Sequence, residues 1–113
     1  MVRNEADIIE TFVRYYLQII DFMIIIDHLS IDETSVILNK LKAEGAPIEI
    51  VKEVRQEFSQ SEVTTRQMQW AAQELGADWI LLLDADEFLV SDEGPNVRPF
   101  LEQFSQEEVY LIL

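Results

Sequence analysis

The sequence predicts an α/β domain of three layers, in which helices cover both faces of a mostly parallel sheet. Short apolar runs alternate with longer amphipathic segments along the chain, and this alternation is typical of parallel strands joined by helices. Polar residues, many of them acids, directly follow two of the apolar runs, at 27–34 and 84–87. Because ligands bind outside the carboxyl ends of the strands in such sheets, we expect a site there.

The expected elements follow in order. Strands are predicted where apolar runs are short and continuous, at the strand exit 1–5 and at 22–26, 48–51, 79–83 and 109–113. Helices are predicted where apolar residues recur three or four positions apart, at 5–18, between Asp32 and Gly45, at 60–75 and at 97–104. The run 79–83 is wholly apolar, which predicts a strand buried on both faces.

Turn and cap residues set the expected boundaries. Asn4 is predicted to cap the first helix, and Ser30 or Asp32 the second, because short polar side chains accept hydrogen bonds from the free amides of a helix start. Gly45 and Gly76 are predicted to end the second and third helices. The inward face of the third helix is expected to carry Val63, Trp70, Ala71 and Leu75.

Composition narrows the partners. The 113 residues suffice for one small domain, and a hydrophobic content of 49% supports a packed core. The net charge of −14 disfavours nucleic acid and anionic membrane surfaces as partners. The sequence has no cysteine for a disulfide, no apolar run of membrane-spanning length and no targeting peptide. Cytoplasmic localisation is therefore the default expectation.

The acids at 84–87 suggest a metal site. Asp84 and Asp86 can face the same side of an extended backbone, because alternate residues share a face. Carboxylates this close repel one another unless a cation or hydrogen-bond donors offset their charge. Oxygen ligands suit hard divalent ions such as Mg, Mn or Ca. A solvated loop or a helix cap would account for the same acids, so this stretch alone does not separate a metal site from a purely structural role.

Three motifs together resemble a known family. Residues 1–7, Met-Val-Arg-Asn-Glu-Ala-Asp, look like the first-strand exit of family 2-like glycosyltransferases with the GT-A fold. Residues 27–34, Asp-His-Leu-Ser-Ile-Asp-Glu-Thr, look like that family's Asp-Asp-Gly-Ser-x-Asp-x-Thr loop, and Leu83 to Glu87 look like its Asp-x-Asp signature. The resemblance spans nearly the whole chain, although His28 and Leu29 replace the family's second Asp and Gly.

The resemblance implies a transferase that moves a sugar from a nucleotide-diphosphate-sugar donor to an unknown acceptor, with Mn or Mg as cofactor. By position, Asp86 would bind the metal, and Asp84 would lie near the ribose or reach the metal through water. The residues implied at the nucleotide are Arg3, Asn4, Glu5, Asp27, Arg66 and Asp84. No catalytic base is named among these residues. The chain would be a fragment, residues 1–113 of the nucleotide-sugar-binding part, lacking the acceptor half and inactive alone.

Other classes stay open as alternatives. A phosphate- or metal-binding α/β module without glycosyl transfer also places acids at strand ends. A nucleotidyltransferase needs a Gly-rich phosphate loop, whereas the glycines lie at 45, 76 and 94; a receiver domain needs a late lysine, whereas the lysines lie at 40, 42 and 52. Apolar strands at the termini leave unpaired edges, so we expect a possible homo-oligomer through them.

Overall fold

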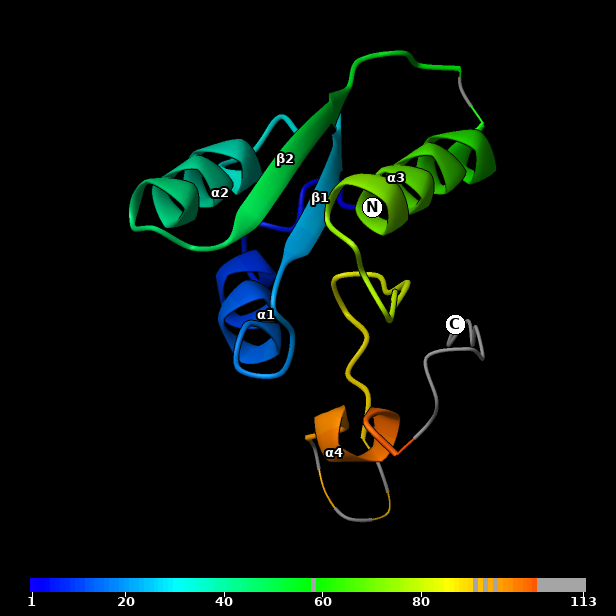
Figure 1. Cartoon of the computed structure of the whole chain (residues 1–113). Helices are drawn as coiled ribbons and strands as arrows, with labels where there is room; N and C mark the ends of the chain where they lie inside the picture. The colour runs from blue at the N-terminus through cyan, green and yellow to red at the C-terminus, as the bar shows by residue number, and fades with distance from the viewer. Residues whose placement is uncertain (58, 91, 93, 95, 104–113) are drawn as a thin grey trace.

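The computed structural model describes residues 1–57, 59–90, 92, 94 and 96–103. These residues form a small α/β domain with a two-stranded parallel sheet (Figure 1). In Figure 1 the two strands run between helices α2 and α3. The elements, in chain order, are α1 (Ile9–Tyr16), β1 (Met23–His28), α2 (Thr34–Ala43), β2 (Ile48–Glu53), α3 (Gln60–Glu74) and α4 (Arg98–Leu101). The predicted α/β class with parallel strands is confirmed, whereas the larger sheet of the GT-A type stays a prediction.

The sheet is built on β1. Met23 to His28 pair in parallel with Ile48 to Glu53, so that Asp27 lies opposite Lys52. On its other edge, β1 is bridged in parallel by Val2, whose amide donates to the carbonyl of Ile26 at 2.8 Å. Of the strand exit predicted at residues 1–5, the structure has one bridge residue, Val2. Asp27 therefore lies between Val2 on one side and Lys52 of β2 on the other.

The core lies between the sheet and the helices α1 and α2. Burial of apolar side chains supplies the main driving force for folding, and α1 supplies four residues of the buried core cluster, Ile9, Phe12, Val13 and Tyr16. The most deeply buried side chains of the domain are Tyr16, Ile9, Leu38, Leu41, Val13 and Thr34. This core fixes the positions of the strand ends that carry the acids.

The prediction that Asn4 caps the first helix is wrong. Helix α1 begins at Ile9, after a turn, and Ile8 stands at the cap without a side-chain hydrogen bond. Asn4 has a φ of 52°, in the left-handed region that asparagine tolerates better than most residues. Its side chain accepts a hydrogen bond from the amide of Ile31 at 2.8 Å, and so serves the second loop instead of the helix.

The third helix confirms the predicted bounds almost to the residue. Ser59 caps α3 by accepting from the amide of Glu62, and Gly76, with a φ of 64°, follows its last turn. Val63 and Ala71 are buried as expected. Trp70 and Leu75, predicted to face inward, are instead 38% and 43% exposed. The buried face of α3 is therefore narrower than its apolar residues indicate.

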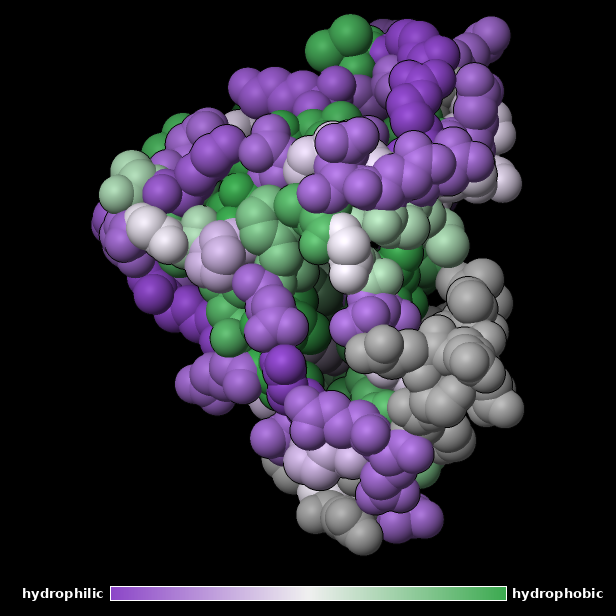
Figure 2. All heavy atoms as spheres, viewed as in Figure 1, coloured by the Kyte–Doolittle hydropathy of each residue, from purple (hydrophilic) through white to green (hydrophobic). Residues whose placement is uncertain are grey.

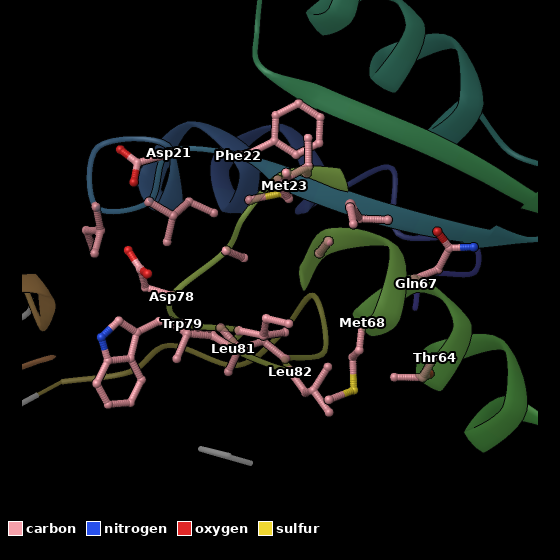
Figure 3. Close-up of a pocket in the computed structure, with 18 of the residues that line it drawn as sticks. Asp21, Phe22, Met23, Thr64, Gln67, Met68, Asp78, Trp79, Leu81 and Leu82 are labelled. Carbon is pink, nitrogen blue, oxygen red and sulfur yellow. The ribbon is translucent and has the colours of Figure 1, made fainter. Parts of the chain in front are cut away.

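The segment 79–83 does not form the predicted strand. It contains one bridge position, at Leu81, and its five side chains are half-buried. A cavity of about 830 Å³ separates this segment from the start of β1 and from α3. Trp79, Leu81 and Leu82 line it from one side and Met68 from α3 (Figure 3). Among the described residues, Val2 alone bridges the edge of β1 that faces away from β2. Segment 79–83 therefore has no neighbouring strand with which to pair at that edge.

The remaining segments extend this picture. Helix α4 occupies the middle of the predicted 97–104 helix, whereas Phe104 and the predicted strand 109–113 lie outside the described residues. Hydrophobic side chains gather in the middle of the face in Figure 2, with hydrophilic side chains above and below them. Among the helices of the described residues, none has the length and apolar character needed to cross a membrane.

Candidate functional site

Two loops that leave neighbouring strand ends are held together by side chains. The amide of Asn4 donates to Ser30 Oγ at 3.1 Å, and the amide of Glu5 donates to Thr34 Oγ1 at 2.9 Å. Ile31 returns a hydrogen bond to Asn4, as described above. Leu29, with a φ of 53°, turns the second loop sharply away from β1. We call residues 4–6 and 29–34 the clasp, because each loop satisfies backbone amides of the other.

Asp32 is the centre of the clasp. Its Oδ1 accepts from the amide and the hydroxyl of Thr34, at 2.9 and 2.5 Å, and its Oδ2 accepts from the amide of Ala6 at 3.2 Å. The hydrogen bond from the Thr34 side chain is the main cause that lowers the pKa of Asp32. The residue before helix α2 is Glu33, so Asp32 satisfies the first helical amide from one position earlier than a formal cap. Ser30 serves Asn4 and does not cap.

Asp27 is buried at the carboxyl end of β1, with 3% of its surface exposed. Its Oδ2 accepts from the hydroxyl of Ser35, in the first turn of α2, at 2.5 Å. Its Oδ1 is buried and has no hydrogen-bond partner among the described residues. A buried carboxylate oxygen without a donor is costly and uncommon, so this atom marks a place where a ligand donor would be favourable.

The acids of the third motif lie on a tight turn. The amide of Glu87 donates to the carbonyl of Asp84, and Glu87 Oε1 accepts from the amide of Asp84, each at 3.0 Å. One carboxylate oxygen from each of Asp84, Asp86 and Glu87 can be chosen so that all three lie within 4.8 Å of one another. All three residues are exposed. Such a set of hard oxygen donors fits Mg or Mn, which takes its other ligands from water and substrate.

A side chain from α1 holds this turn in place. The hydroxyl of Tyr16 donates to the carbonyl of Glu87 at 2.9 Å and accepts from the amide of Leu89 at 2.8 Å. Tyr16 itself is 1% exposed. Burial raises the pKa of its phenol, so it stays a neutral hydroxyl at physiological pH. Sequence analysis does not find this contact, because nothing local in the sequence links positions 16 and 87.

The clasp and the turn border one polar cavity of about 340 Å³. It brings together four of the residues implied by the resemblance and adds His28 and Gln60, which the sequence analysis did not assign. The lining residues are Met1, Val2, Arg3, Glu5, His28, Gln60, Asp84 and Asp86. Arg3 supplies a cationic side chain alongside three acids, so the cavity offers groups for both an anion and a cation.

The other predicted site residues lie apart from this cavity. Asn4 belongs to the clasp. Asp27 is not a lining residue, but its neighbour His28 and its bridge partner Val2 both are. Arg66 lies on the exposed side of α3, with its guanidinium 3.6 Å from the carboxylate of Glu62, and does not line the cavity. Its role toward a nucleotide stays a prediction.

Glu87 is the functional candidate that the sequence analysis left out of its site. It belongs to the acidic run that suggested a metal site, but the resemblance assigned metal ligands only to Asp84 and Asp86. Comparisons with protein-family models, with curated proteins and with solved structures gave no match to this chain. The assignment of a function therefore depends on the residues and their geometry.

Proposed function

We propose that this domain binds the donor of a metal-dependent glycosyltransferase, a nucleotide-diphosphate-sugar, at the edge formed by the clasp and the turn 84–87. The observation that carries the proposal is the convergence of the three motifs. Residues of the first and third motifs line one cavity together with His28 of the second. The fold would then be part of a larger sheet of the GT-A type.

Each part of the donor has a chemical counterpart in this arrangement. Asp84, Asp86 and Glu87 would hold Mn or Mg, and the bound ion would supply charge neutralisation for the diphosphate. Arg3 lines the same cavity, and its guanidinium would add a second positive group for the phosphates. Charge that develops on a departing nucleotide diphosphate is stabilised by groups of this kind.

The nucleoside would occupy the part of the cavity nearest β1. Asp27 is buried beside this part of the cavity, next to the lining residues Val2 and His28, and its unpaired Oδ1 would accept from a base N–H or a ribose hydroxyl only if binding opened a path to it. Ser35 fixes the other oxygen of this carboxylate, so its orientation is set before a ligand binds. Glu5 lines the same cavity and is held through its amide by Thr34. The clasp thus orders the nucleoside side of the site.

Calorimetric titration with uridine and guanosine diphosphates, with and without Mn, tests the proposal. We expect metal-dependent binding that Asp86→Asn abolishes. Asp78→Asn is the matched control, because it removes the same charge from an exposed acid outside the turn 84–87. Equal loss in both variants would indicate general charge attraction by an acidic domain instead of a site.

The alternative is a metal-binding module without glycosyl transfer, which the exposed carboxylates of the turn also suit. The same titration separates the two functions. Mn binding that Asp86→Asn abolishes, without any binding of nucleotide diphosphates, would favour the module. Binding of neither Mn nor nucleotide would contradict both.

A further inference from the structure

We infer that Tyr16 is a positioning residue for the turn 84–87, and that its hydroxyl sets the affinity of the carboxylates for a divalent metal. The inference rests on the proposed function. Tyr16 lies on α1, 71 residues from Glu87, and its hydroxyl bonds to the backbone carbonyl of that residue, not to its carboxylate. It acts on the backbone at and just after the last of the three carboxylates.

The Tyr16 hydroxyl links two backbone groups at the end of the turn, and we call this pair of hydrogen bonds the Tyr16 bridge. The carbonyl of Glu87 and the amide of Leu89 both bond to one phenol oxygen. The segment between them carries no helix or strand, so neighbouring strands do not fix it. A side chain buried to 1% exposure in the core supplies the missing constraint.

Aromatic packing supports the same bridge. Phe88, which lies between the two bonded groups, packs its ring against Tyr15 with centroids 5.1 Å apart and against Tyr16 with centroids 6.0 Å apart. Phe12 completes the cluster from the preceding turn of α1, 4.8 Å from the Tyr16 ring. The ring of Tyr16 anchors residue 88 by packing, whereas its hydroxyl fixes the backbone on both sides. The variant Tyr16→Phe therefore keeps the packing and removes only the bridge.

The consequence for metal binding follows from repulsion among the carboxylates. Three exposed acids with oxygens within 4.8 Å spread apart unless their backbone is held. Holding them together before the ion arrives removes an ordering cost from binding. Groups that orient metal ligands from outside the coordination sphere typically change affinity about 10–100-fold when they are removed.

Titration of the 113-residue chain with Mn alone tests the inference. We expect Tyr16→Phe to weaken Mn binding about 10-fold or more, at a temperature where circular dichroism shows the variant folded. Tyr15→Phe is the matched control, since it removes a phenol hydroxyl from the neighbouring ring of the same aromatic cluster. Hydrogen exchange of the Leu89 amide is expected to accelerate in Tyr16→Phe and to stay slow in Tyr15→Phe.

The outcomes are distinct. Equal Mn affinity in the wild type and folded Tyr16→Phe overturns the inference and leaves the proposed function standing. Equal weakening by Tyr15→Phe and Tyr16→Phe also overturns it, because general loosening of the cluster then explains the change. A wild type that binds no Mn overturns the proposed metal site and the inference together. Unchanged exchange at Leu89 shows that the hydroxyl does not hold the segment, and overturns the bridge itself.

Discussion

Ser35→Ala removes the hydrogen bond that, among the residues that the structure describes, is the single one to the buried carboxylate of Asp27. The Ser35 hydroxyl lies 2.5 Å from Asp27 Oδ2, and the other oxygen is already without a partner among the described residues. Removing the hydroxyl leaves both oxygens of a side chain with 3% exposure without a donor in the described part of the chain. A hydrogen bond to a charged group contributes about 1.5–3 kcal/mol to stability.

Helix propensity offsets part of this loss. Alanine favours a helix over serine by about 0.5 kcal/mol, so we expect the variant to lose about 1–2.5 kcal/mol of unfolding free energy. Ser61→Ala is the matched control. Ser61 is the second residue of α3, as Ser35 is of α2, but it is exposed and its hydroxyl makes no hydrogen bond in the described structure. We expect Ser61→Ala to be neutral or slightly stabilising.

Urea unfolding followed by tryptophan fluorescence measures both variants against the wild type. Repeating Ser35→Ala in an Asp27→Asn background tests the charged acceptor, since a hydrogen bond between neutral groups is worth only about 0.5–1.5 kcal/mol. The cost of Ser35→Ala should shrink in that background. The reasoning is refuted if Ser35→Ala costs no more than Ser61→Ala, or if its cost is the same with and without Asp27→Asn.

Two further predictions concern pH and packing. Hydrogen bonds from the Arg55 side chain are the main cause that lowers the pKa of Glu53 from 4.5 to about 2; stability from this group is therefore complete above about pH 4.5 and is lost as the pH falls toward 2. Glu53→Gln should flatten the dependence of the unfolding free energy on pH in that window, and an unchanged slope would contradict the assignment. Leu38 is fully buried in α2, so Leu38→Ala should lower the unfolding free energy by about 2–5 kcal/mol. Val36 lies on the exposed face of the same helix, so Val36→Ala should change the unfolding free energy by less than about 0.5 kcal/mol. Similar losses in both variants would contradict the assigned core.

Local signals predicted the helices and the first two strands because their causes are local. Gly76 ends α3 since its φ of 64° is easy only for glycine, and Ser59 starts the same helix by a hydrogen bond three residues along. The strands β1 and β2 are short apolar runs between turns, which sequence patterns identify well. Their parallel direction followed from the helix between them, whereas their register is known only from the structure.

The failures have tertiary causes. Asn4 has the chemistry of a cap, but its side-chain oxygen accepts instead from the amide of Ile31, 27 residues away. The run 79–83 has the composition of a buried strand, yet pairing depends on an edge that Val2 occupies. The hydrogen bond from the Tyr16 hydroxyl to Glu87 depends on the whole fold, because the two residues are 71 positions apart. The acids at 84–87 do lie close together, but their role as metal ligands stays a prediction.

The spacing of the contacts also has a consequence for the order in which the chain assembles. Residue 2 pairs with 27 and residue 23 with 48, so the two closures around β1 span equal lengths of 25 residues and carry equal entropy costs. The contact of Tyr16 with Glu87 spans 71 residues, which adds about 1 kcal/mol of closure entropy by the logarithmic law. Closure entropy alone therefore favours neither side of β1, and it makes docking of the acidic turn the costliest of these three closures.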